Sequence, residues 1–307
     1  MDPALLPALY DAMIVARTGS VGVAAKRLHK TPSAVSQQLR RLTESLGVPL
    51  FERRGRGLVL TQAAAHVLPA ATRLFDEAES VFRLFGEMTG SAATTLRIAA
   101  SDYLGKPLLV PVLRDLAVEG APLHFEISTV HSEEALTLLE RGEVEMAIVS
   151  FSGERVGLTA TRLFEQPFFW VGPKPQRKAP KAQKLTQRLE REPLLRLAAG
   201  SLGRRLSDEL LERHGLRPAS IIDVPSVSLL LAYATGGVGI GLAPALPIEP
   251  RDLERASIEP AGIPALPVQL MVRAGRRPVP AVQRFVERLL KEAERQRARL
   301  LQLAGKK

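Results

Sequence analysis

The segment Ser20–Thr61 constrains the fold more than any other part of this chain. It predicts two short helices joined by a tight turn and followed by a basic β-hairpin, which is the arrangement of a winged helix-turn-helix. Ser20 is placed to cap the first helix, which ends near Leu28. Thr31 can cap the second helix, and Pro32 takes its first position, where a missing N–H costs nothing.

The second predicted helix, residues 32–46, has two distinct faces and ends at Gly47. An apolar stripe repeats at steps of four, three and four, and its members are Val35, Leu39, Leu42 and Leu46. Another face carries hydroxyls, an amide and a guanidinium, from Ser33, Ser36, Gln37 and Arg40. Glutamine can pair with adenine and arginine with guanine in a major groove. An ordinary solvated face is the alternative, but the turn, the Pro start and the hairpin favour a DNA-reading helix.

The hairpin, or wing, is expected to have strands at residues 50–52 and 58–60 around a turn at 53–57. Three arginines beside two glycines suit contact with phosphates or a minor groove. Residues 26–56 carry eight Lys or Arg against two Glu, which supports this interpretation. The predicted DNA-binding residues are Ser20, Thr31, Pro32, Ser33, Ser36, Gln37, Arg40, Arg53, Arg54 and Arg56.

These residues resemble the LysR-type transcriptional regulators. The resemblance rests on Gly19-Ser20, Ala24-Ala25, Leu28, the run Thr31 to Gln38, the run Leu46 to Arg53, and Leu60-Thr61. Two positions depart from the family pattern. Ala64 stands where the family commonly has a glycine, and Pro69 lies inside the next helix. Neither departure affects the residues expected to face the groove.

Composition narrows the class of protein further. At 307 residues, 46% of them hydrophobic, the chain can form a small domain and one or two larger ones. The absence of cysteine excludes disulfides, thiolate metal sites and a cysteine nucleophile. No stretch has the length and apolar character of a membrane span, and the start does not resemble a signal peptide, so a cytoplasmic protein is expected. The net charge of +10 suits double-stranded DNA as a partner.

A long helix is predicted from Thr61 to about Met88, followed by a hinge at residues 86–91. Its apolar residues alternate steps of four and three, as in a coiled coil, and are Val67, Ala71, Leu74, Ala78, Val81 and Phe85. A helix packed on its own domain is the alternative. We expect a dimerising helix, because a dimer places two recognition helices on two symmetric half-sites.

Beyond the hinge, predicted strands and helices alternate, which indicates an α/β fold with parallel sheets and helical crossovers. The expected strands are 96–100, 124–130, 145–150, 194–198, 220–224 and 268–273; the expected helices are 104–118, 133–141, 202–214 and 278–303, with a helix-to-strand run at 227–243.

The family resemblance implies how this region is divided. LysR-type regulators have a C-terminal domain of two α/β subdomains that resembles periplasmic binding proteins, with a small ligand held between them, and they are commonly tetramers. The expected division is a DNA-binding domain at 1–60, a linker helix and hinge at 61–90, and an effector domain at 91–307. Its first subdomain would comprise 91–164 and 268–307, and its second 165–267.

Parallel sheets bind ligands beyond the carboxyl ends of their strands, where helix N-termini favour anions. The residues after the predicted strands are therefore the candidate effector site: Ser101, Asp102, His131, Ser132, Phe151, Ser152, Ser201, Gly203 and Ser226. Any one of these serines could be a simple helix cap. Their shared position, with Arg204 and Arg205 nearby, favours a small anion or an amino acid as effector.

Other signals point away from catalysis. The run Gly237 to Gly241 lacks the spacing of a dinucleotide loop and predicts a turn into a buried strand. The five histidines show no metal-ligand spacing, and no cofactor is expected. Residues 173–184 are expected to form a solvated basic loop, and residues 295–307 a fraying helix end. The leading hypothesis is a ligand-responsive, sequence-specific transcription regulator and not an enzyme; the alternative is an architectural DNA-binding protein without an effector.

Overall fold

The computed structural model describes residues 3–54, 57–89, 94–120, 123–174, 184–275 and 280–305. The chain divides into two compact units. The first consists of Met1–Ala93 with Ala274–Val279, and the second of Thr94–Arg273 with Pro280–Lys307.

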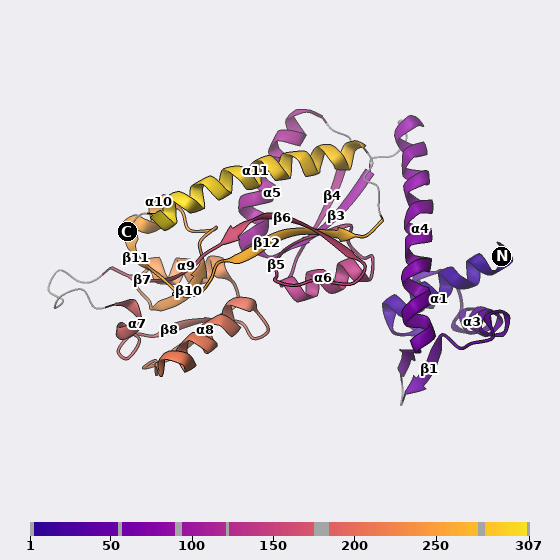
Figure 1. The fold of residues 1–307 in the computed structure, drawn as a ribbon, viewed down its shortest axis with the longest axis horizontal. Coiled ribbons are helices and arrows are strands. Elements are labelled where there is room, and N and C mark those ends of the chain that lie inside the picture. The colour runs from indigo at the N-terminus through magenta and orange to yellow at the C-terminus, as the bar shows by residue number, and fades with distance from the viewer. Residues whose placement is uncertain are drawn as a thin grey trace. The chain divides into compact units, whose positions relative to one another are not determined.

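The first unit is a winged helix-turn-helix followed by a long helix (Figure 1), as the sequence predicted. Its elements are η1 (Pro3–Leu5), α1 (Leu6–Thr18), α2 (Val21–Arg27), α3 (Pro32–Leu46), β1 (Phe51–Arg54), β2 (Gly57–Leu60) and α4 (Gln62–Thr89). The predicted caps are confirmed: Ser20 Oγ accepts the N–H of Val23, and Thr31 Oγ1 accepts that of Ala34. Gly47 has a φ of 71°, the left-handed conformation that ends a helix without strain.

Two details of the first unit differ from prediction. Val35 and Leu42 are buried and Leu39 is partly buried, but Leu46 is 41% exposed because the core clusters extend along α3 only as far as Leu42. The wing turn is also shorter than expected. Arg54 pairs with Gly57 in the antiparallel hairpin, so residues 53, 54 and 57 belong to the strands, and residues 55 and 56 lie outside the described chain.

The second unit contains two sheets. The first sheet has the strand order β4-β3-β5-β12-β6. Its strands are β3 (Thr94–Ala100), β4 (Leu123–Thr129), β5 (Met146–Ser150), β6 (Leu158–Gln166) and β12 (Leu266–Arg273), and its helices are α5 (Asp102–Val118), α6 (Ser132–Glu140) and α11 (Pro280–Gly305). Helix α6 packs on β3, β5 and β12, while α11 packs along α5 and β6 (Figure 1). These elements are called the first subdomain below.

The second sheet has the order β11-β7-β10-β8-β9 and defines the second subdomain. Its strands are β7 (Phe168–Pro173), β8 (Leu194–Leu197), β9 (Ile221–Val224), β10 (Ile240–Pro244) and β11 (Ala256–Pro260), and its helices are α7 (Leu185–Arg188), α8 (Leu202–His214), α9 (Val227–Thr235) and α10 (Pro250–Arg255). Ile240 and Leu242 join the core under α8, whereas a Cβ on Gly241 would meet Leu230 of α9 at 2.9 Å. Successive residues of β10 thus face opposite helices, and glycine allows α9 to approach closely.

The expectation of parallel sheets is correct only in part. Strands β3, β4 and β5 are parallel, as are β8, β9 and β10, but β12 runs antiparallel to β5, and β7 runs antiparallel to β10. Each antiparallel strand lies where the chain passes between the sheets, at Gln166–Phe168 for β7 and at Leu266 for β12.

The expected fraying of the C-terminal helix is wrong. Helix α11 continues to Gly305, Leu300 is buried, and Arg299 donates hydrogen bonds to the carbonyls of Leu246 and Ile248. The basic loop at 173–184 lies mostly outside the described residues, which omit 175–183.

Candidate functional site

The polar face of α3 is presented to solvent as a groove-reading helix requires. Ser33, Gln37 and Arg40 are exposed, and Ser36 is half-buried. The hydroxyls of Thr31 and Ser33 lie 3.0 Å apart, and Thr31 also caps the helix. Thr31 and Pro32 therefore fix where α3 begins, while Gln37 and Arg40 have exposed side chains that can reach a base edge or a phosphate.

An ion pair that sequence reasoning missed anchors the turn between α2 and α3. Asp11 in α1 is fully buried, and Lys30 Nζ lies 2.8 Å from both of its carboxylate oxygens. The lysine is 37% exposed. The pair joins α1 to the turn, so it holds the start of α3 against the domain core. A lone aspartate within an apolar helix gave no signal of its partner nineteen residues away.

For the arginines of the wing that lie in β1, the structure describes the backbone and not the side chains. Arg53 and Arg54 lie in β1, and Arg56 lies outside the described residues. Their predicted contacts with DNA stay predictions.

The predicted dimerisation seam on α4 separates into two parts. Val67 is partly buried against the core of its own domain, and Ala71 is 4% exposed. Leu74, Val81 and Phe85 are 44%, 44% and 60% exposed, and Ala78 is also exposed. Phe82, which the heptad pattern omitted, is 76% exposed. The predicted hinge begins later than expected, because residues 86–89 are still helical and 90–91 lie outside the described chain.

All nine residues of the candidate effector site line two adjoining cavities in the second unit. One cavity, of about 50 Å³, is lined by seven of them: Ser101, Asp102, His131, Ser132, Ser201, Gly203 and Ser226. The other, of about 250 Å³, is lined by His131, Ser132, Phe151 and Ser152. The cavities share His131, Ser132 and Leu202, and together they are called the cleft below. Both subdomains contribute to its walls.

Four helices begin at the cleft, but only two of them have a side chain that caps the N–H groups of the first turn. Ser201 Oγ and Ser226 Oγ accept the N–H groups of Arg204 and Leu229, so α8 and α9 are capped by side chains. Helices α5 and α6, whose N-cap residues are Ser101 and His131, have no side-chain cap. Their first N–H groups are therefore available to an anion, and the helix dipoles favour one.

Serine hydroxyl groups add further hydrogen-bond donors and acceptors to the cleft. Ser132 Oγ accepts the N–H of Ser150, which ties α6 to the end of β5. Ser101 Oγ and Ser150 Oγ are both buried at the cleft, where the hydroxyl of Tyr103 interacts with each of them.

Tyr103 was missed although it directly follows Ser101 and Asp102. Its phenol interacts with both of these serine hydroxyls, and burial raises the pKa of Tyr103 to about 12. It therefore stays neutral and can donate a hydrogen bond. Ser150 was missed as well, although its place at the end of β5 was a usable signal.

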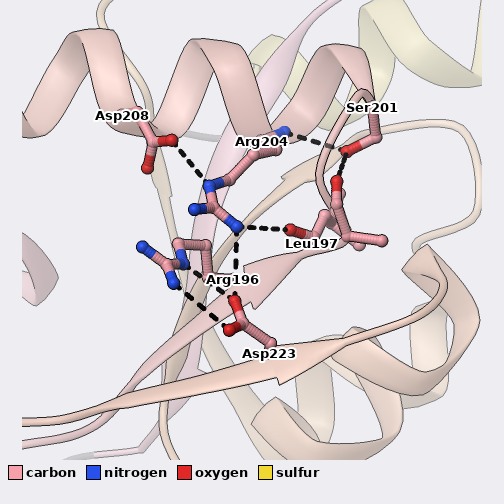
Figure 2. A network of polar contacts seen from close by, with 7 residues as sticks. Arg196, Leu197, Ser201, Arg204, Asp208 and Asp223 are labelled. Atoms are coloured by element: carbon pink, nitrogen blue, oxygen red, sulfur yellow. Dashed lines mark hydrogen bonds and ion pairs between the residues drawn. The ribbon is translucent and has the colours of Figure 1, made fainter.

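The two arginines near the start of α8 have different surroundings. Figure 2 shows Arg204 within a network of polar contacts that includes Asp208, Asp223 and the carbonyl of Leu197. Its guanidinium contacts Asp208 at 2.6 Å and Asp223 at 3.3 Å, and Arg196 also contacts Asp223, at 2.8 Å. Arg204 is thus occupied as a structural cation. Arg205 is exposed and lines the larger cavity of the cleft.

Gly203 has a packing role. A Cβ at this position would lie 2.5 Å from Leu197 Cδ1, so glycine lets the start of α8 lie against β8. Asp102 lies at the edge of the cleft, where its Oδ2 accepts a hydrogen bond of 3.0 Å from Ser228 Oγ of α9. This contact joins the two subdomains directly.

Comparison with known protein families assigns both units of the chain. Residues 8–65 match the bacterial regulatory helix-turn-helix proteins of the lysR family, and residues 89–294 match the LysR substrate-binding domain. The chain belongs to the LysR family. Its members are DNA-binding transcription regulators that respond to small-molecule effectors and act as oligomers, and they are not enzymes.

LysR-family relatives match most of the chain. The regulator TfdS of Cupriavidus pinatubonensis is 31% identical over 75% of this chain and 79% of its own length. A probable nitrogen assimilation transcriptional activator of Synechococcus elongatus is 27% identical over 94% of each chain. The fold is similar to that of full-length LysG from Corynebacterium glutamicum with bound effector Arg, with a TM-score of 0.68 and 20% identity, covering 96% of this chain and 99% of that one.

Among the described residues, no helix has both the length and the apolar character needed to span a membrane.

Proposed function

We propose that this LysR-type regulator binds a small carboxylate, and most favourably an α-amino acid, in the cleft, and that this binding changes how a dimer or tetramer of the chain engages its operator. The observation that carries the proposal is the cleft itself. Two helix starts without side-chain caps meet there, beside one carboxylate and the buried hydroxyls of Ser101 and Ser150.

The charge pattern of the cleft favours an amino acid over a simple anion. A carboxylate would accept hydrogen bonds from the first turns of α5 and α6. Asp102 would repel a purely anionic ligand, but it can pair with the ammonium of a zwitterion. In exchange, it would give up its hydrogen bond from Ser228, so the ligand would replace a direct contact between subdomains. A population shift between two arrangements of the subdomains follows from this exchange.

The cleft contains little free volume in this structure. A volume of about 50 Å³ holds one or two waters, because a water occupies about 30 Å³. The adjoining 250 Å³ approaches the lower end of ligand-pocket sizes, about 300 Å³. A small ligand therefore requires some opening of the cleft or the use of both cavities.

For DNA, we propose the residues and domains that the sequence predicted. Ser33, Ser36, Gln37 and Arg40 would contact base edges and phosphates, and Arg53, Arg54 and Arg56 would contact the backbone. Residues 1–60 would be the DNA-binding domain, 61–90 the linker and 91–307 the effector domain. The protein would act in the cytoplasm.

For assembly, the exposed part of the α4 seam, from Leu74 to Phe85, supports pairing of two copies. Val67 and Ala71 would contribute less than predicted, because they already pack within their own chain.

A thermal-shift screen of the full chain tests the effector class. Fluorescence of Trp170, a buried residue in β7, reports unfolding of the effector domain. We expect one or more of the twenty amino acids to raise the melting temperature in a dose-dependent way, and the matching carboxylate without the amino group to raise it less. Ser101→Ala should reduce the shift, and the exposed Ser128→Ala should not. A stronger response to the des-amino compounds would contradict the role given to Asp102.

A further inference from the structure

A third cavity, larger than those of the cleft, lies in the second unit. It has a volume of about 500 Å³, and α5, α9, α10 and α11 form its walls. Asp102 and Tyr103 line both this cavity and the cleft, so the two spaces share a wall at the start of α5. Much of its surface is apolar, from residues such as Pro107, Val110 and Leu231.

The carboxylates around this cavity already have partners. Glu249 pairs with Arg251 at 2.8 Å, and Asp252 Oδ2 accepts the N–H of Glu249 at 2.8 Å. Asp102 accepts the hydrogen bond from Ser228. Two of the basic residues that line the cavity differ from these carboxylates. In the part of the chain that the structure describes, neither Lys106 nor Arg255 has an ion-pair partner, and both are exposed at the cavity.

Arg299 extends from α11 to the same wall. Its guanidinium donates to the carbonyls of Leu246 and Ile248, and its buried Nε has no hydrogen-bond partner among the described residues. Burial lowers the pKa of Arg299, and its interactions with Glu249 and Glu292 only partly oppose this effect. A partly buried guanidinium with carbonyl contacts but no carboxylate in ion-pair contact, among the residues described, is an unfavourable arrangement that a bound anion would relieve.

We propose that this cavity is a second ligand site, distinct from the cleft, for an organic anion with an apolar body. Its size fits a molecule of that kind, since ligand pockets span about 300–1,000 Å³, are lined mainly by apolar groups and hold a few fixed polar ones. The apolar part would lie against α5 and α9. The anionic group would face Arg299, Arg255 and Lys106. The cavity includes residues of both subdomains, so an occupant would contact both.

Calorimetric titration of the full chain tests this proposal with 4-phenylbutyrate as the probe and its neutral amide as the matched control. We expect saturable binding of 4-phenylbutyrate at one site per chain, and at least tenfold weaker binding of the amide. Arg255→Gln and Lys106→Gln should each weaken 4-phenylbutyrate binding severalfold. Ala232→Trp should abolish it, because Ala232 lines the cavity on an exposed face of α9 and the indole would fill the space.

Ser101→Ala separates the two sites. It alters the cleft and should leave the 4-phenylbutyrate Kd within twofold. The proposal is overturned if folded wild-type protein gives no saturable binding, if the amide binds as tightly as the acid, or if Ser101→Ala weakens binding while Arg255→Gln does not. A failure of Ala232→Trp to fold leaves the two charge variants to decide. If the probe does not bind and Ala232→Trp instead changes the molar mass in light scattering, the cavity faces a second copy of the chain, which also overturns the proposal.

Discussion

The ion pair between Lys30 and Asp11 should control the local stability of the helix-turn-helix. Lys30→Met keeps the apolar stem of the side chain but leaves a fully buried carboxylate without its cation. Removing one partner of a buried pair typically costs about 3–5 kcal/mol. Because Lys30 is 37% exposed, water can reach the carboxylate from that side, and we expect the lower end, about 3 kcal/mol.

Hydrogen exchange of the full chain measures this effect where it should occur. A loss of about 3 kcal/mol should accelerate exchange of the protected amides of α1 and α3 roughly a hundredfold, since about 1.4 kcal/mol corresponds to a factor of ten. Amides of α8, which belongs to the other compact unit, should be unchanged. The double variant Asp11→Leu with Lys30→Met should recover most of the loss, because an apolar pair leaves no charge buried. If Lys30→Met changes exchange less than threefold, the pair does not anchor the turn.

Three other predictions address DNA binding, assembly and pH. Gln37→Ala should reduce discrimination between the preferred operator and other sequences by about 1–3 kcal/mol in a competition assay. Arg54→Ala should instead weaken binding to all sequences and lower the slope of log affinity against log salt concentration by about one. Equal effects of both changes on every sequence would refute direct readout of bases by Gln37. Val81→Glu combined with Phe82→Glu places charges on the exposed face of α4 and should lower the molar mass in light scattering, so an unchanged mass would exclude that face as the interface. The hydrogen bond from Arg196 lowers the pKa of Asp223, so this ion pair stabilises the fold above about pH 4 and the stabilisation is lost as pH falls through the lowered pKa. Asp223→Asn should therefore lower the melting temperature more at pH 7 than at pH 2, and an equal drop at both would contradict the assignment.

The sequence predicted those features that local chemistry determines. Thr31, Pro32 and Gly47 bound α3, because a cap, a proline start and a left-handed glycine each act within one helical turn. The residues of the cleft were predicted for a similar reason. They follow strands directly, and the carboxyl ends of parallel strands converge in any sheet of this kind.

Features that depend on contacts distant in sequence were not predicted. Alternating apolar residues in β12 look the same whether the strand runs parallel or antiparallel to β5. The heptad pattern of α4 cannot show which surface each residue meets, so it did not separate Ala71, which is buried in its own chain, from the exposed Val81. Arg204 looked available for an anion, but the fold brings Asp223 to its guanidinium.

Occupancy of the cleft should change DNA binding, and one measurement tests this directly. Operator duplexes would first be selected from random DNA with the full chain. Binding of the selected duplex would then be titrated with and without the amino acid that gives the largest thermal shift, for wild type and for Ser101→Ala. We predict that the amino acid changes the affinity or the number of protein copies bound in wild type, and that Ser101→Ala reduces this change without altering binding in its absence. Identical titrations with and without the amino acid, at concentrations that saturate the thermal shift, would contradict the account.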